Sequence, residues 1–162
     1  MEQSEPRIAE EIARAYDRYG KMLFRMCMVI LGNRQDAEDA VQDTFAKYLK
    51  TRPVFHEAEH EKAWFLRVAE NRCRDKRRAA SFRRTVSLEE LGEYAETPEE
   101  SEALSRLAEL PPRSRSVLYL HYVEGYKARE IAQLLHIREG AVKTALCRGR
   151  EALRKKLKEE PA

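Results

Sequence analysis

The sequence predicts an all-α protein made of two small helical domains that are joined by an acidic, flexible linker. Apolar residues recur at helical spacing along most of the chain, and no segment alternates apolar and polar residues as a strand does. Glycine and proline are sparse at six residues each, and 43% of the 162 residues are hydrophobic, which is enough to form a core. We place the first domain at residues 1–84, the linker at 85–97 and the second domain at 98–162.

Charge is distributed unevenly, although the net charge is only +3. Residues 60–84 hold nine Lys or Arg against three acids, and residues 138–158 hold eight against two. Residues 85–110, between them, hold one Arg against eight Glu. Two basic segments on either side of an acidic connector suit two contacts with one long polyanion. The alternative is that charge is segregated for solubility alone.

The first domain is expected to begin with one or two helices over residues 7–31. Gly32 suits the position after the last helical turn, and Asn33 suits the N-cap of the next helix, with Asp36 at its third position. That helix runs from about Arg34 to Lys50. Its expected inner face consists of Ala37, Ala40, Val41, Thr44, Phe45 and Leu49.

A loop is expected over residues 51–59, because Pro53 breaks the helix and Phe55 has no obvious helical partner. A long basic helix follows, over about residues 60–80. Its expected apolar side consists of Ala63, Trp64, Leu66, Val68 and Ala69. We interpret Trp64, the one tryptophan of the chain, as a core residue and not as a ligand contact.

The second domain is expected to begin at Thr97, a good N-cap residue that is followed by Pro98 and, at the third helical position, Glu100. The helix that follows should end at the pair of prolines at 111–112. Its inner face is expected to hold Leu104, Leu107, Ala108 and Leu110. A further helix, over about residues 113–123, carries Val117, Leu118, Leu120 and Tyr122 and stops before Gly125.

The last segment has the pattern of a helix-turn-helix. A short helix over about residues 128–135 is followed by a turn at 136–139 and by a strongly basic helix that starts near Gly140. The apolar positions of the basic helix are Val142, Ala145, Leu146, Leu153 and Leu157. Its other faces carry Lys143, Arg148, Arg150, Arg154, Lys155 and Lys156. Since such motifs place a basic helix in the DNA major groove, the segment predicts a DNA reader.

The three cysteines do not suggest a disulfide framework, because their number is odd and no two form a CxxC pair. Cys27 and Cys147 lie among apolar residues and are expected to be packing residues. Whether Cys73 is redox-sensitive depends on its burial. No segment resembles a signal peptide or a membrane span, so we expect a soluble, cytoplasmic protein without direct membrane insertion.

Three segments occur in a fixed order: NRQDAEDAVQDTFAKYL (33–49), AWFLRVAENRCRDKRR (63–78) and GYKAREIAQLLHIREGAVKTALCRGREALRKKL (125–157). In this order they resemble the extracytoplasmic-function (ECF) group of bacterial sigma-70 factors, from about Tyr16 to Leu157. The resemblance implies a sigma region 2 bundle and a sigma region 4 helix-turn-helix. It implies a sigma factor that directs core RNA polymerase to promoters and assists melting, with no enzymatic activity, cofactor or metal.

The resemblance implies that the acidic side of the helix at 34–50 binds core polymerase, on the clamp helices of its β′ subunit, with further contacts to the β subunit. The matching residues are Asp36, Glu38, Asp39, Gln42 and Asp43. An exposed acidic helix suits a basic partner groove. Taken alone, the same residues would be read as an ordinary solvated face.

For the promoter −10 element, the resemblance implies contacts from the long basic helix and from the loop before it. Asn71 offers a donor and an acceptor to a base edge, while Arg67, Arg72 and Arg74 can hold phosphates. The loop matches one that captures an unstacked base, and Phe55 there could stack on it. The loop residues implied in this role are Phe55, His56 and Glu57.

For the −35 element, the resemblance implies duplex reading by the last helix and phosphate or flanking contacts beside it. The implied residues are Arg138, Lys143, Thr144, Cys147, Arg148 and Arg150. Two positions depart from the family's pattern. Ala141 replaces a frequent hydroxyl N-cap residue, so that Gly140 or the backbone must cap the helix, and Ala145 replaces a frequent arginine.

Two other classes of function are alternatives to a sigma factor. A free-standing helix-turn-helix regulator would not need the acidic helix and the Phe55 loop, and a nucleic-acid enzyme would need a metal site for which His56 and His60 alone are weak evidence. Many members of the ECF group are held inactive by a membrane-anchored anti-sigma factor. The resemblance therefore implies an anti-sigma partner, and the linker would permit the rearrangement.

Overall fold

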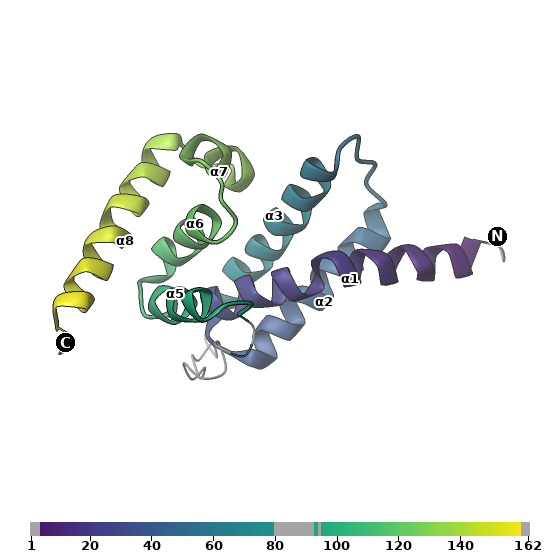
Figure 1. The fold of residues 1–162 in the computed structure, drawn as a ribbon. Helices are drawn as coiled ribbons and strands as arrows, with labels where there is room; N and C mark the ends of the chain where they lie inside the picture. The colour runs from purple at the N-terminus through teal and green to yellow at the C-terminus, as the bar shows by residue number, and fades with distance from the viewer. Residues whose placement is uncertain (1–3, 80–92, 94, 160–162) are drawn as a thin grey trace.

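The computed structural model describes residues 4–79, 93 and 95–159, and the described part is built from α-helices (Figure 1). The helices are α1 (Ser4–Leu31), α2 (Arg34–Thr51), α3 (Ala58–Arg77), α5 (Pro98–Ala108), α6 (Pro112–Tyr122), α7 (Ala128–Leu135) and α8 (Glu139–Glu159). The predicted all-α class is confirmed, and each predicted helix has a counterpart within a few residues of its expected bounds. Most of the expected linker, at 85–92 and 94, lies outside the described residues.

Aromatic rings form the centre of the bundle made by α1, α2 and α3. The Phe65 ring is fully buried, and its centroid lies 4.9 Å from that of Tyr19, 5.3 Å from that of Phe45 and 5.0 Å from that of Trp64. Trp64 is partly buried against this core, as expected. Phe65, absent from the predicted apolar side of this helix, is therefore its main anchor, because three neighbouring helices meet around one large ring.

The junction between α1 and α2 is confirmed in detail. Gly32 adopts φ 61°, and its N–H donates to the Met28 carbonyl at 2.8 Å, which ends α1. The Asp36 N–H donates to the Asn33 side chain at 3.0 Å, as an N-cap requires. The prediction for Leu49 is wrong: its side chain is exposed, and the neighbouring Tyr48 packs against the core instead.

The loop between α2 and α3 is shorter than predicted. Arg52 adopts the left-handed conformation (φ 46°) and its N–H donates to the Tyr48 carbonyl at 2.9 Å, so the helix ends just before Pro53. Helix α3 begins at Ala58 and not at about His60, because Glu57 already adopts the extended backbone of an N-cap. At its other end α3 stops at Arg77, short of the expected Ala80, which lies outside the described residues.

Helices α5 and α6 confirm the predicted caps and add one residue to the core. The Glu100 N–H donates to the Thr97 hydroxyl at 3.0 Å, and Leu104, Leu107 and Leu110 are buried. The side chain of Ala108 lies outside the described residues. In α6 the fully buried tyrosine is Tyr119, which the sequence analysis did not name, whereas Tyr122 is half exposed.

The helix-turn-helix is formed by α7 and α8. The turn begins at His136, whose φ of 57° ends α7, and the Val142 N–H donates to the Arg138 carbonyl at 3.2 Å to start α8. Ala141 therefore lies inside the first turn of α8 and not at its N-cap. Gly149 is buried where α8 crosses α6, and a Cβ there would lie 2.2 Å from a methyl of Leu118. Its missing side chain lets the two helices approach closely.

The two halves of the molecule pack against each other. Helix α1 contacts α5 and α6, and the N-terminal part of α3 contacts α7 (Figure 1). The last turns of α1, from Met26 to Leu31, are fully buried on all sides. A helix that is apolar all round is a buried helix, and here α2 and α3 cover one side while α5 and α6 cover the other.

Candidate functional site

The acidic side of α2 carries the residues expected to bind polymerase. The side chains of Glu38, Asp39 and Asp43 are 43%, 42% and 52% exposed. Gln42 is exposed beside them, and the N–H of Asp36 is used in capping the helix. Within the described residues the acids have weak ties to neighbouring cations. These are Arg34 to Glu38 at 3.3 Å and the Lys76 Nζ at 3.9 Å from both Asp39 and Asp43. The face therefore remains open to a basic partner.

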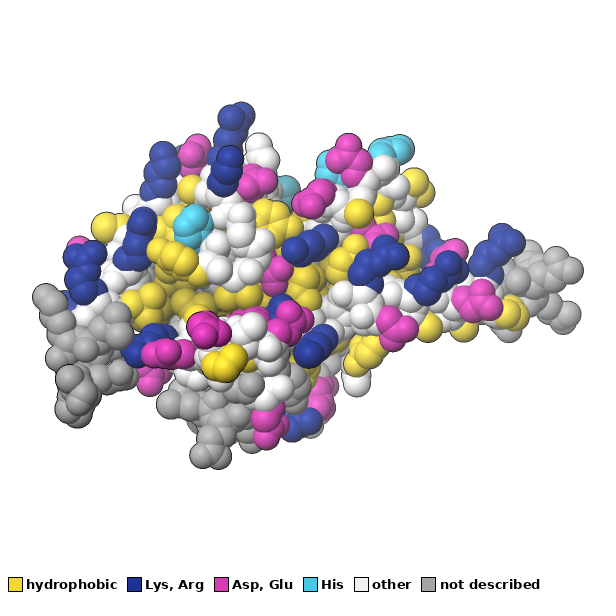
Figure 2. Space-filling model, in the orientation of Figure 1, with side chains coloured by type: hydrophobic (Ala, Val, Ile, Leu, Met, Phe, Trp, Pro, Cys, Tyr) yellow, Lys and Arg dark blue, Asp and Glu magenta, His cyan; other side chains and the backbone are white. Residues whose placement is uncertain are grey.

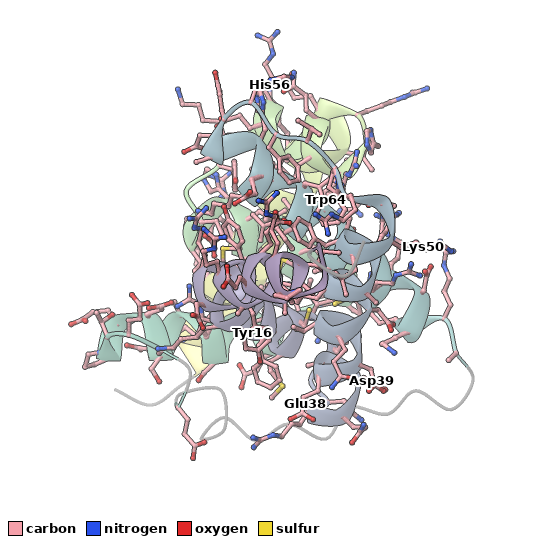
Figure 3. All side chains as sticks on the ribbon, turned by 90° about the vertical axis from the view of Figure 1, so that its right-hand side faces the viewer. Tyr16, Glu38, Asp39, Lys50, His56 and Trp64 are labelled. Atoms are coloured by element: carbon pink, nitrogen blue, oxygen red, sulfur yellow. The ribbon has the colours of Figure 1, made fainter. Side chains whose placement is uncertain are left out.

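A hollow of about 480 Å³ lies between α1 and α2, directly beside the acidic side. Its apolar lining comes from Tyr16, Phe24 and Val41, and Glu38 and Gln42 belong to both the hollow and the acidic side. Tyr16 is 56% exposed. Figure 3 shows Tyr16 on α1 on the same side of the molecule as Glu38 and Asp39. Tyr16 could not be predicted as part of this surface, because its position next to the inward Ala15 on a helix gives no sign of a shared surface with α2.

A second hollow, of about 220 Å³, lies along the outer side of α3. Its lining consists of Lys47, Val68, Asn71, Arg72, Arg74, Asp75 and Arg78. It brings together three of the expected −10 residues, Asn71, Arg72 and Arg74. It also adds two cations, Lys47 from α2 and Arg78 from the end of α3, that were not among the predicted contacts. Lys47 could not be placed from sequence, since it comes from a different helix.

Several cations of α3 already have protein partners. Arg74 lies 2.7 Å from Glu70, whose side chain is 5% exposed, and Arg72 lies 3.8 Å from Asp75. Arg67 does not join this group. Its guanidinium points to the other half of the molecule and donates to Nε2 of His136 at 2.8 Å. The structure thus separates Arg67 from the other expected −10 cations.

The loop before α3 lies far from the acidic side of α2. Figure 3 shows His56 at the opposite end of the molecule from Glu38 and Asp39. Phe55 lies in this loop, as predicted; it is half-buried, and its ring centroid lies 6.0 Å from that of Trp64. His56 and Glu57 are exposed. Val54, which was not predicted as a contact, is the outermost apolar residue of the loop at 83% exposed.

The basic side of α8 is open. All six residues expected at the −35 element are exposed: Arg138, Lys143, Thr144, Cys147, Arg148 and Arg150. Figure 2 shows Lys and Arg side chains projecting along the outer side of α8. Lys143 lies 3.5 Å from Glu139, and the Nε of Arg150 donates to the Leu146 carbonyl at 3.2 Å. The exposure of Cys147 corrects its expected role as a packing residue.

Cys73 is fully buried beside Cys27. Burial, together with a hydrogen bond between the two thiols, raises the pKa of Cys73 well above its usual range. Because the thiolate is the reactive form, Cys73 is not a reactive thiol in the folded chain.

The described part of the chain offers neither a metal site nor a membrane span. No three His, Cys, Asp or Glu side chains there lie close enough together to hold a metal ion, and His56 and His60 gain no third ligand. Among the described helices, none combines the length and the apolar character needed to cross a bilayer.

Comparison with known proteins identifies both halves of the chain. The family described as Sigma-70 region 2 matches residues 15–83, and the family described as Sigma-70, region 4 matches residues 101–153. The ECF RNA polymerase sigma factor SigL of Mycobacterium tuberculosis is 35% identical over 154 residues, which cover 89% of this chain and 87% of SigL.

Two solved structures share the fold. One is CnrH in complex with the cytosolic domain of CnrY, with a TM-score of 0.67 and 24% identity over 94% of this chain and 91% of that one. The other is the sigma factor RpoE in complex with the anti-sigma factor NepR from Bartonella quintana, with a TM-score of 0.67 and 19% identity over 94% and 99%. At these identities the likeness concerns the fold.

Proposed function

The chain belongs to the ECF group of the sigma-70 family and is a sigma factor that directs RNA polymerase to promoters, and on that premise we propose which surfaces do this. The observation that carries the function is that regions 2 and 4 follow each other in one chain, in the order that SigL shares. We propose region 2 for residues 1–84, a linker for 85–97 and region 4 for 98–162. A free-standing helix-turn-helix regulator is not favoured, because it would lack region 2.

Core polymerase is proposed to bind the acidic side of α2 and the hollow next to it. The acids Asp36, Glu38, Asp39 and Asp43, with Gln42, would meet a basic surface of the polymerase, by resemblance the β′ clamp helices, with further contacts to the β subunit. Tyr16 supports this assignment, because a half-exposed aromatic beside an acidic patch suits an apolar anchor inside a charged interface. Charge complementarity there would speed association.

The −10 element is proposed to bind along the outer side of α3 and at the loop before it. Asn71, Arg72 and Arg74 lie together at one hollow, where an amide for a base edge is surrounded by cations for phosphates. The loop residues Phe55, His56 and Glu57 are proposed to hold an unstacked base, with the Phe55–Trp64 ring pair as the stacking surface. We extend the −10 surface to Lys47, which lines the same hollow.

The −35 element is proposed to bind α8 in the major groove. Six exposed side chains along one helix offer both base-edge and phosphate contacts: Arg138, Lys143, Thr144, Cys147, Arg148 and Arg150. The chemistry of RNA synthesis stays with the polymerase, so we propose no catalytic residue in this chain. It would act in the cytoplasm, where polymerase and promoter DNA are found.

An anti-sigma factor is a further proposed partner. The two solved relatives of similar fold are complexes, one with the cytosolic domain of CnrY and one with the anti-sigma factor NepR. These partners belong to those proteins, but they support the proposal that this chain too is held by a dedicated protein, for which the resemblance to the ECF group implies a membrane anchor.

Run-off transcription with purified bacterial core polymerase tests the proposal. The first template is the DNA upstream of the chain's own gene, because members of the family often transcribe their own genes. We expect a discrete start site that appears only when the protein is added. Absence of a transcript together with absence of core binding would overturn the proposed assignment of the α2 surface.

Charge reversal locates the polymerase surface. Asp39→Lys combined with Asp43→Lys should weaken core binding by at least about 10-fold, since each exposed acid then repels a basic partner. Glu102→Lys is the matched control, because Glu102 is an exposed acid (67%) on α5, away from α2. Equal loss of binding in the control would show that net charge, and not the α2 surface, is responsible.

A further inference from the structure

We infer that Gly20, in the interior of α1, is a positioning residue for the polymerase surface: it lets the Tyr16 ring lie flat on the helix, where the ring is a fixed apolar anchor. The inference rests on the proposed binding of core polymerase to the acidic side of α2 and the hollow beside it. It adds to that surface a residue that touches no partner itself, since Gly20 is buried under the ring.

Gly20 is unusual for its place in the chain. Helix α1 runs without a break over Ser4–Leu31, and Gly20 lies near its middle, away from any turn. Glycine is the least favourable residue after proline in a helix interior. The backbone there does not require glycine, because the described glycines with a positive φ are Gly32 and Gly125. The reason for a glycine must therefore lie in the space around it.

The Tyr16 ring occupies that space. A Cβ on Gly20 would lie 3.3 Å from each of three ring atoms, Cδ1, Cδ2 and Cε1, so the face of the ring covers the glycine. The same ring packs against the buried Phe45, with the two centroids 5.3 Å apart. Tyr16 nevertheless remains 56% exposed. The ring is therefore held against the protein and still offers surface to a partner.

The ring that Gly20 holds forms one wall of the hollow between α1 and α2. Phe24 and Val41 contribute the rest of its apolar lining, and Glu38 joins the hollow to the acidic side of α2. Tyr16 lies on the same side of the molecule as Glu38 (Figure 3). A ring that is already in place loses less entropy on binding than a mobile one. We therefore expect an apolar side chain of core polymerase to lie on this ring, inside the charged interface.

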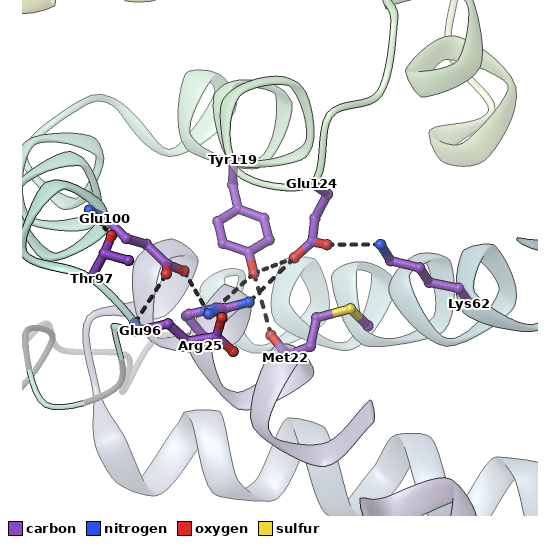
Figure 4. Close-up of polar contacts among 8 residues, drawn as sticks. All are labelled: Met22, Arg25, Lys62, Glu96, Thr97, Glu100, Tyr119 and Glu124. Atoms are coloured by element: carbon purple, nitrogen blue, oxygen red, sulfur yellow. Dashed lines mark hydrogen bonds and ion pairs between the residues drawn. The ribbon is translucent and has the colours of Figure 1, made fainter. Parts of the chain in front are cut away.

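Helix α1 is tied down beyond Gly20 by the side chain of Arg25 (Figure 4). Arg25 is only 11% exposed and forms ion pairs with Glu100 of α5 at 2.5 Å and with Glu124, after α6, at 3.8 Å. The Tyr119 hydroxyl accepts from Nε of Arg25 at 3.4 Å and donates to Glu124 at 2.8 Å. These contacts lie on a different side of α1 from the hollow and fix the position of the helix.

A second tie holds α1 just before Gly20. The Tyr19 hydroxyl donates to Glu61 of α3 at 2.7 Å, and the Tyr19 ring stacks on Phe65 with the centroids 4.9 Å apart. Since α1 is fixed on both sides of Gly20, the backbone cannot easily shift to make room for a methyl group there. The half-exposed Tyr16 ring can. A side chain at position 20 should therefore displace the ring and leave the helix where it is.

Gly20→Ala in the full chain separates positioning from stability. Alanine favours a helix over glycine, so the variant should be no less stable in denaturant unfolding. It should nevertheless bind core polymerase about 3-fold more weakly, because the displaced ring loses part of its contact. Gly140→Ala is the matched control, since a Cβ there meets nothing within 4 Å, and it should leave core binding unchanged. A loss of stability without a loss of core binding would overturn the inference.

A double-mutant cycle tests whether Gly20 acts through the ring. Tyr16→Ala removes the ring and should weaken core binding by about 10-fold, whereas Tyr16→Phe keeps it and should stay within about 2-fold of the unchanged protein. In the Tyr16→Ala background, Gly20→Ala should cause no further loss, because no ring is left to displace. The same fold loss with and without the ring would overturn the inference, because the glycine would then affect binding by another route.

Unfolding in urea needs no polymerase and separates this inference from the proposed function. In the Tyr16→Ala background, Gly20→Ala should raise the urea midpoint by roughly 0.3 M, because nothing opposes the new methyl group. With the ring present the rise should be smaller. Equal rises would show that the ring does not lie on Gly20 and would overturn the inference. Unequal rises in a chain that never binds core polymerase would keep the ring contact and overturn the proposed polymerase surface.

Discussion

Helices α3 and α8 are both basic and both proposed to bind DNA, yet they present their charges differently. On α3 several cations contact protein groups: Arg74 pairs with Glu70, Lys76 lies more loosely near Asp39 and Asp43, and Arg67 donates to His136. On the described part of α8, Lys143 is the cation with an acidic partner, and Arg148 and Arg154 face solvent. Helix α8 is therefore ready to meet duplex DNA, whereas α3 must exchange protein contacts for DNA contacts.

The largest expected difference between the two helices is in the reactivity of their cysteine thiols. Cys147 on α8 is exposed, and Cys73 on α3 is fully buried with a raised pKa. In the native protein, a water-soluble disulfide reagent should modify Cys147 at least about a thousand-fold faster than Cys73, since Cys73 must wait for an opening that costs several kcal/mol. Counting fast-reacting thiols measures this. One fast thiol is expected, and none in Cys147→Ser; a second fast thiol in that variant would contradict the burial of Cys73.

The way each helix is anchored gives the next contrast. Helix α3 is anchored by the buried Phe65 ring, whereas α8 packs closely on α6 because Gly149 has no side chain. Phe65→Ala should lower the free energy of unfolding by about 3 kcal/mol through the cavity it leaves, and Gly149→Val by about 2 kcal/mol through overlap with Leu118. Denaturant unfolding measures both changes. Gly140→Ala is the control, because a Cβ there meets nothing within 4 Å, and it should be neutral or slightly stabilising.

Much of the difference between α3 and α8 could be predicted from the sequence. The features that could not be predicted depend on how several helices pack together. The caps at Asn33 and Thr97, the bounds of α7 and the open cations of α8 follow from local spacing and side-chain chemistry. Phe65 and Tyr119 were missed because helical period alone does not say which of two adjacent apolar residues faces inward once several helices surround one element. The contact of Arg67 with His136 spans 69 residues and depends on how the halves pack, which local patterns do not encode.

Substitutions on α8 and on α3 should differ in their effect on DNA binding by about tenfold or less. Arg148→Ala removes a free cation from α8 and should weaken binding of a −35 duplex by about 5- to 10-fold, with a salt dependence lower by about one counterion. Arg74→Ala should change that binding by less than about 2-fold, because its charge is largely balanced by Glu70. Fluorescence anisotropy at several salt concentrations measures both. Equal losses would mean that α3 also contacts the −35 duplex.

The smallest expected effect is a pH dependence of the contact between α3 and the second half. The Lys62 ammonium lies 5.8 Å from the centroid of the Tyr126 ring. Burial, with the charge of Glu59, raises the pKa of Tyr126 to about 12. The packed chain therefore keeps a proton on Tyr126 that a solvent-exposed tyrosine loses near pH 10. The contact between α3 and the second half is fully supported below that pH and weakens as pH rises from about 10 to 12.

Tyrosinate absorbance during a pH titration, with Tyr126→Phe as the comparison, measures this step. The variant should lose a transition near pH 12 and keep those near pH 10. If instead the variant lost a transition near pH 10, Tyr126 would be exposed to solvent in the free chain and the contact with α3 would be absent.

The position of Arg25 also bears on how sigma domains can be recombined. A chimera that kept residues 1–84 but received region 4 from another relative would retain Arg25 and lose Glu100, Tyr119 and Glu124, the groups that neutralise it. Packing the two halves of such a hybrid together would bury a guanidinium without a counter-charge, which is strongly disfavoured. The halves of grafted hybrids should therefore pack poorly, and restoring their contact would require transplanting the acidic pair and the tyrosine together.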